Sequence, residues 1–171
     1  AADARTSLDV ELAAKPRGQA YDLFVLDAFA GDAVPTHLLT REAFDLYTAH
    51  LSTTGMIAVH VSSNWVDLIP VVYAWAEAES WQALTISTRG GADGVSGNHA
   101  IWLLLFNHQG TLPILAEQCL PLREEGKIQV QNLSNVDYGD LRPWTDTRSD
   151  LLALMRSRLR LREDLASRIS R

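Results

Sequence analysis

An aspartate stands at the point where an apolar run ends, in the segment 22–27 (DLFVLD). A second polar side chain, Asn64, comes just after the apolar run 56–61 (MIAVHV). In open α/β sheets, ligands bind beyond the carboxyl ends of the parallel strands, where the connecting loops meet. If both runs are parallel strands, Asp27 and Asn64 project into one cleft. The alternative is that Asp27 caps a turn within DAFAGD, as aspartates in loops commonly do.

Two further side chains are candidates for the same cleft. Trp65 follows Asn64 in the predicted strand-end loop and is the tryptophan expected to line a pocket, whereas the other tryptophans are expected in the core. Asp146, in PWTDTRSD, either lines the cleft from the C-terminal side or stands at a helix start, where the helix dipole favours a carboxylate.

No metal site is predicted, because the five histidines show no metal-ligand spacing. His60 lies inside a predicted strand and is interpreted as a core histidine with satisfied hydrogen bonds. Cys119 is the single cysteine, which excludes an intramolecular disulfide and a zinc site built from cysteines. We therefore expect a reducing, cytoplasmic location.

The elements that would position these residues alternate between helix and strand. A short helix is predicted over 5–14, and the unbroken apolar run after it indicates a central parallel strand covered on both faces. Thr40 is a predicted N-cap for a helix through His50, which STTG (52–55) ends before the strand 56–61. A second helix begins near Asp67, with inward-facing positions Val71, Val72, Trp75 and Ala78.

The later half of the chain predicts a different arrangement. Two strands, 81–88 and 99–106, are separated by a glycine-rich segment too short for a crossover helix, so they form an antiparallel hairpin. A short helix within 110–118 and an edge segment near 126–131 follow. We expect residues 1–148 to form an α/β domain and residues 149–171 an arginine-rich amphipathic helix. A parallel sheet finished by an antiparallel hairpin is typical of class I methyltransferase-like folds.

Composition narrows the class of ligand. The chain has 171 residues, 47% of them apolar, which suits one compact domain. No apolar run approaches the roughly 18 residues of a membrane helix, so no membrane partner is expected. Residues 148–171 contain seven arginines and three acidic residues, whereas the remainder contains eight basic and 18 acidic residues. An acidic body suits a small cationic or neutral substrate and disfavours a nucleic acid.

The segment 21–47 (YDLFVLDAFAGDAVPTHLLTREAFDLY), followed by 55–65 (GMIAVHVSSNW), resembles the second half of spermidine synthase and of the bacterial spermidine synthase-like proteins. The resemblance continues through 94–106 (GVSGNHAIWLLLF) and 142–152 (RPWTDTRSDLL). It implies an α/β, Rossmann-like methyltransferase fold in partial form, comprising strands 4–7 with the antiparallel C-terminal hairpin and lacking the N-terminal cofactor-binding strands.

The resemblance also implies a chemistry, namely aminopropyl transfer from decarboxylated S-adenosylmethionine to a diamine such as putrescine. Asp27 matches the family's turn aspartate and would orient and deprotonate the attacking amine. Asp32 would hold the cation or the sulfonium side chain. The synthases carry two aspartates three apart, in an Asp-Ser-Ser-Asp pattern, whereas Asp27 and Asp32 are five apart. This spacing fits the synthase-like group better than the true polyamine synthases.

The family's cofactor contacts are mostly absent from this sequence. There is neither a glycine-rich turn after a first strand nor an acidic residue after a second. Asp3, in ADAR, matches the family's aspartate that contacts adenine, and the alternative is a frayed terminal residue. We expect S-adenosylmethionine or its decarboxylated form as co-substrate, no tightly bound cofactor, and a homo-oligomer or missing N-terminal sequence completing the site. Methyl transfer from S-adenosylmethionine, and a non-catalytic oligomerisation or scaffold role, are the alternatives.

Overall fold

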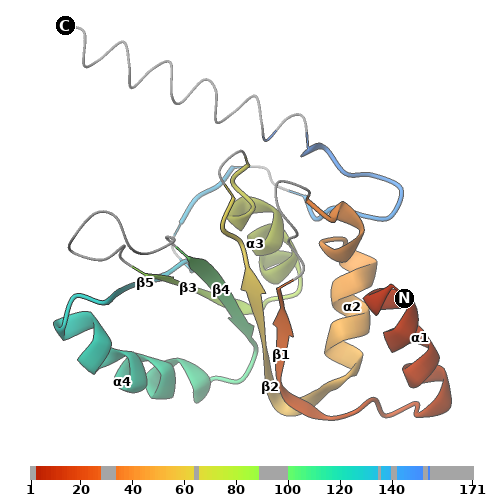
Figure 1. Ribbon diagram of the computed structural model, residues 1–171, viewed down its shortest axis with the longest axis horizontal. Coiled ribbons are helices and arrows are strands. Elements are labelled where there is room, and N and C mark those ends of the chain that lie inside the picture. The colour runs from red at the N-terminus through yellow and green to blue at the C-terminus, as the bar shows by residue number, and fades with distance from the viewer. Residues whose placement is uncertain are drawn as a thin grey trace, which may run out of the picture.

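The computed structural model describes residues 3–27, 34–63, 66–88, 100–134, 136–139, 142–151 and 154 of the chain. Within these residues lies one mixed sheet with helices packed against it (Figure 1). Across the sheet the strands follow the order β1 (Tyr21–Leu26), β2 (Leu51–His60), β4 (Ile101–Phe106), β3 (Gln82–Thr88) and β5 (Ile128–Asn132).

The pairing of the strands confirms the predicted change of direction along the chain. β1 and β2 are parallel, whereas the β2–β4, β4–β3 and β3–β5 pairs are all antiparallel. The predicted hairpin is therefore the β3–β4 pair, and the predicted edge segment is β5. Because β1 and β2 run in the same direction, their carboxyl ends meet at one edge of the sheet.

One face of the sheet is covered by two helices, α2 (Arg41–Ala49) and α3 (Ile69–Ala78). Phe44 of α2 stacks on Trp75 of α3 with ring centroids 4.7 Å apart, and Tyr47 stacks on Phe24 of β1 at 4.8 Å. Thr40 caps α2 by accepting a hydrogen bond from the backbone N–H of Ala43, as predicted. These aromatic contacts join the two helices to each other and α2 to β1, while α3 packs against β3 and β4.

The inward face of α3 differs in one position from the prediction. Val71, Val72 and Trp75 are buried, but Ala78 is exposed. Ala78 is the last residue of the helix, beyond the part that the sheet and α2 cover.

The outer side of β1 corrects the prediction of a strand covered on both faces. Successive side chains of a strand point to opposite faces, and Tyr21, Leu23 and Val25 on one face of β1 are 40%, 52% and 53% exposed. Among the described residues, β1 pairs with β2 alone. An unbroken apolar run indicates that both faces of a strand are apolar. It does not indicate which other part of the protein, if any, packs against each face.

β2 begins earlier than predicted, because STTG belongs to the strand. Gly55 lies close to the backbone of β1, since a Cβ at this position would stand 2.6 Å from the carbonyl oxygen of Tyr21. The pairing shifts at this place, from Tyr21 opposite Leu51 to Leu23 opposite Met56. Glycine here permits a close approach of two backbones and does not break the strand.

The remaining helices lie at the two sides of the sheet. α1 (Ala4–Ala14) runs beside α2, where the ring nitrogen Nε2 of His50 lies 3.1 Å from the carbonyl oxygen of Leu8 (Figure 1). A single 3-10 turn, η1 (Thr36–Leu38), precedes α2. α4 (Thr111–Glu124) packs against β5 and is longer than the predicted helix, continuing through Pro121.

The predicted arginine-rich helix 149–171 lies largely outside the described residues. Leu151 and Leu154 are helical and pack against the core. In the described part of the chain, no helix is both long enough and apolar enough to cross a membrane.

Candidate functional site

Asp27 directly follows β1 and meets a side chain from the end of β2. The parallel register pairs Leu26 with Val59, so the next residues along each strand are neighbours. Oδ1 of Asp27 lies 2.8 Å from Nδ1 of His60. The Asp27 side chain is 55% exposed, whereas that of His60 is 24% exposed. The Asp27 carboxylate is thus exposed to solvent at the sheet edge and contacts the less exposed imidazole of His60.

His60 is held on its other sides as well. Its Nε2 lies 2.8 Å from Oγ of Ser62, and that oxygen accepts a 2.6 Å hydrogen bond from the backbone N–H of Ile101. The imidazole stacks on Trp102, the residue opposite it in β4, with ring centroids 4.8 Å apart and planes 20° apart. A row of hydrogen bonds therefore runs from the backbone of β4 through Ser62 and His60 to Asp27.

This cluster stands on the face of the sheet opposite α2 and α3. Alternation along the strands places His60 on the same face as the exposed Leu23 and Val25, while Phe24 packs on Tyr47 of α2 on the other side. The cluster is consequently at the carboxyl edge of the parallel strands and beside an open apolar surface. That is the place where ligands of such sheets bind.

Sequence reasoning located one member of this cluster, Asp27, and misjudged another. Both ring nitrogens of His60 have hydrogen-bond partners, as the interpretation of a satisfied histidine expected, but its side chain is 24% exposed and lies beside an exposed carboxylate, so its placement in the core was wrong. The pattern His60-x-Ser62 places both side chains on the same side of the strand end, next to Asp27 on the parallel neighbour. That pattern could have identified the cluster. Asp32, Asn64 and Trp65 lie outside the described residues.

Asp146 belongs to a second cluster, near the N-terminus of α2. Its two carboxylate oxygens each accept a 2.6 Å hydrogen bond from the guanidinium of Arg5, and Oδ1 also accepts one from the hydroxyl of Thr40 at 2.8 Å. The backbone N–H of Asp146 donates to a carboxylate oxygen of Glu42. Asp146 thereby ties the C-terminal segment to α1 and α2.

Asp3 lies in the same cluster and caps α1. Its Oδ1 accepts hydrogen bonds from the backbone N–H groups of Arg5 and Thr6, and its Oδ2 lies 3.0 Å from Nε2 of His37. This is the usual function of an aspartate at a helix N-cap. The predicted contact between Asp3 and adenine remains a prediction.

Hydrogen-bond partners lower the pKa of both carboxylates in this second cluster. The hydrogen bonds from Arg5 are the main cause that lowers the pKa of Asp146, and those from Thr40 add to it. The hydrogen bond with His37 is the main cause that lowers the pKa of Asp3. Both groups therefore stay ionised to a lower pH than an unpaired aspartate.

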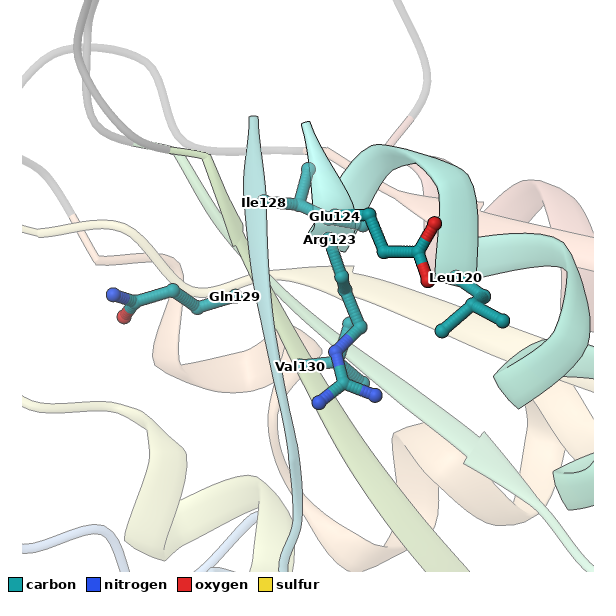
Figure 2. A pocket seen from close by; sticks show the side chains of 6 residues that line it. All are labelled: Leu120, Arg123, Glu124, Ile128, Gln129 and Val130. Carbon is teal, nitrogen blue, oxygen red and sulfur yellow. The ribbon is translucent and has the colours of Figure 1, made fainter. Parts of the chain in front are cut away.

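A shallow groove lies elsewhere, between α4 and β5. Figure 2 shows the side chains that line it, among them Arg123 and Glu124 of α4. The other lining residues are Leu120, Ile128, Gln129 and Val130. It contains neither Asp27 nor Asp146, and β5 is separated from β1 by three strands. The groove therefore does not contribute to the Asp27 cluster.

Comparisons with known proteins point to one family. A 48-residue stretch, 28% of the chain, is 40% identical to the polyamine aminopropyltransferase of Vibrio vulnificus and spans 16% of that protein. The structure is similar to that of a probable spermidine synthase from Corynebacterium glutamicum, with a TM-score of 0.57 and 20% identity. The similarity covers 88% of this chain and 54% of that one. No family model matches the chain.

These findings support a spermidine synthase-like relationship. The mixed sheet of the chain, and its similarity to the probable synthase over most of its length, fit a Rossmann-like methyltransferase fold. It spans about half of the solved protein, 54%, and the matched stretch is a smaller share still of the aminopropyltransferase.

Proposed function

We propose that this chain provides the amine-activating half of an aminopropyl transfer site, with Asp27 as the base. The observation that supports this assignment is the position of Asp27. Its carboxylate stands at the carboxyl edge of two parallel strands and is 55% exposed, and His60 engages one of its oxygens. In the described part of the chain, the other oxygen, Oδ2, accepts no hydrogen bond.

The chemistry requires a carboxylate with these properties. An alkylammonium has a pKa near 10, so a diamine arrives charged and cannot attack until one nitrogen loses a proton. Oδ2 of Asp27 would bind the ammonium, orient it and accept that proton. The neutral nitrogen then attacks the aminopropyl carbon of decarboxylated S-adenosylmethionine. The C–N bond forms while the C–S bond breaks, and its electron pair leaves with sulfur, which becomes a neutral thioether.

The other half of the site would come from polypeptide packed beside β1. Tyr21, Leu23 and Val25 form an exposed apolar row along this edge strand. Edge strands with open hydrogen-bonding groups favour pairing with a further strand. We propose that a second copy of the chain covers this edge and that the nucleoside binds where the two copies meet.

A panel of ligands tests the proposed function on the full chain. Thermal unfolding would be followed with decarboxylated S-adenosylmethionine, S-adenosylmethionine, methylthioadenosine, putrescine and spermidine. A ligand at a hundred times its Kd stabilises the folded state by about 2.7 kcal/mol, which raises Tm by roughly 5–10 °C for a chain of this size. We expect the decarboxylated co-substrate and methylthioadenosine to produce this shift.

Other outcomes of the same panel separate the alternatives. A shift with S-adenosylmethionine that exceeds the shift with its decarboxylated form would favour methyl transfer. The absence of a shift with every nucleoside would contradict a complete site and favour the scaffold role. Light scattering on the same sample reports whether binding accompanies a dimer, which the proposed cover of β1 requires.

A further inference from the structure

The hydrogen bond between His60 and Asp27 has a fixed direction. An ionised carboxylate only accepts hydrogen bonds, so Nδ1 of His60 must carry the proton that lies between it and Oδ1 of Asp27. A neutral imidazole then has an acceptor at Nε2, and the hydroxyl of Ser62 donates to it. Oγ of Ser62 in turn accepts from the backbone N–H of Ile101. The three hydrogen bonds of this row therefore run in compatible directions, each from a donor to an acceptor.

The same row restricts how Asp27 can move. The imidazole cannot rotate without losing the Ser62 contact and the stack on Trp102. Ser62 lies just after β2 and Trp102 lies in β4, and both strands are interior strands of the described sheet. Ser62 is itself anchored to the backbone of β4. Asp27 directly follows β1, which is an edge strand among the described residues, and its side chain is 55% exposed. Its orientation is therefore set by the interior strands through His60.

We propose that His60 is a positioning residue for Asp27, kept in its Nδ1–H tautomer by Ser62, and that it holds Oδ1 so that Oδ2 alone faces an ammonium ligand. This inference rests on the proposed function and adds to it a second residue and a tautomer. The ring provides the hydrogen bond that orients the carboxylate, and Trp102 and Ser62 keep the ring in place. The site would receive a single primary ammonium group.

Two amide substitutions test which ring nitrogen matters. The amide nitrogen of asparagine lies as many bonds from Cβ as Nδ1 of histidine does, whereas the amide oxygen of glutamine lies as many bonds from Cβ as Nε2 does and can accept from the hydroxyl of Ser62. His60→Asn therefore keeps a donor for Asp27 and loses the Ser62 contact, and His60→Gln does the reverse. Because a misplacement of about 1 Å in a reacting group can cost roughly a hundredfold in rate, we expect kcat to fall by about that factor in His60→Gln and by only several-fold in His60→Asn.

The measurements are kcat and KM for putrescine at saturating decarboxylated co-substrate. A positioning role predicts that His60→Gln changes kcat far more than KM. Equal losses in the two variants, or a larger loss in His60→Asn, would overturn the inference. Circular dichroism and Tm on each variant show whether the fold is retained, so a folding defect is not read as a change in the site.

A second measurement does not depend on turnover. Long-range ¹H–¹⁵N correlation spectra of ¹⁵N-histidine-labelled chain report which ring nitrogen of His60 carries the proton. We expect Nδ1–H in the unmodified chain and a loss of this preference in Asp27→Asn, whose amide can itself donate. A proton on Nε2 in the unmodified chain contradicts the inference whatever the activity. If the tautomer is as expected but the unmodified chain transfers no aminopropyl group, the proposed function fails and the positioning of Asp27 stands.

Discussion

Two carboxylates of this chain, Asp27 and Asp146, have opposite kinds of partner. Both oxygens of Asp146 accept hydrogen bonds from the permanently charged guanidinium of Arg5, and Thr40 donates a third. Among the described residues, Asp27 has one partner, the imidazole of His60, at one oxygen. A carboxylate neutralised by arginine joins segments of the chain, whereas one that is oriented but not neutralised keeps its charge for a cationic ligand. The comparison shows why exposure alone does not identify a reactive aspartate, because Asp146 is also 42% exposed.

The largest expected difference between the two is in turnover. Asp27→Asn keeps the shape of the side chain but removes the proton acceptor, so we expect kcat/KM for the diamine to fall by roughly 10²–10⁴-fold, the usual contribution of a general base. Asp146→Asn is the matched control, and we expect it to change kcat/KM by less than about threefold. Initial rates of methylthioadenosine release at neutral pH measure both.

The reverse ranking would contradict this division of roles. If Asp146→Asn abolished turnover while Asp27→Asn retained it, Asp146 would line the substrate cleft, as one interpretation of the sequence predicted. A comparable loss in both variants would mean that the two clusters form one site.

Much of the fold could be predicted because its features are local. The N-cap at Thr40, the helix that begins near Pro70 and the hairpin between β3 and β4 each follow from a few neighbouring residues. Gly55 was misinterpreted because the reason for a glycine there is the backbone of β1, which is distant in sequence. The exposure of Leu23 was missed for a similar reason, since an apolar run does not say which neighbour covers it.

The candidate site was predictable only in part. The position of Asp27 followed from a rule about strand ends, but its partner did not. His60 and Asp27 are separated by 33 residues and meet only because β1 and β2 are parallel and in register. The Arg5–Asp146 pair spans 141 residues and joins the N-terminal helix to a C-terminal segment. No local pattern contains either contact, whereas the pairing of the strands and the packing of α1 on α2 determine both.

A smaller effect is expected on stability, and it should appear in Asp146 rather than Asp27. Asp146→Asn weakens the paired hydrogen bonds to Arg5, but the pair is partly exposed, so we expect a loss of about 1 kcal/mol or less. For a chain of this size that lowers Tm by roughly 2–4 °C at most. Asp22→Asn is a suitable control, because this aspartate is exposed and, within the described part of the chain, its side chain accepts only from the hydroxyl of Ser52. Equal Tm values for Asp146→Asn and Asp22→Asn would show that the Arg5 contact does not stabilise the fold.

The smallest expected effect is the dependence of that stabilisation on pH. Arg5 lowers the pKa of Asp146 in the folded state, so the ion pair contributes fully above the ordinary aspartate pKa of about 3.9 and its contribution is lost as the pH falls through the lower, folded value. The difference in free energy of unfolding between the unmodified chain and Asp146→Asn should therefore be constant from about pH 5 to pH 8 and shrink below about pH 4. Urea unfolding at several pH values measures this difference. Asp3 also has a lowered pKa, because of His37, but it is present in both proteins and its contribution cancels in the subtraction.

A difference that stayed constant down to pH 3 would mean that Arg5 and Asp146 stabilise the chain through packing and neutral hydrogen bonds. The contrast with Asp27 would then rest on the open oxygen of Asp27 rather than on charge neutralisation at Asp146.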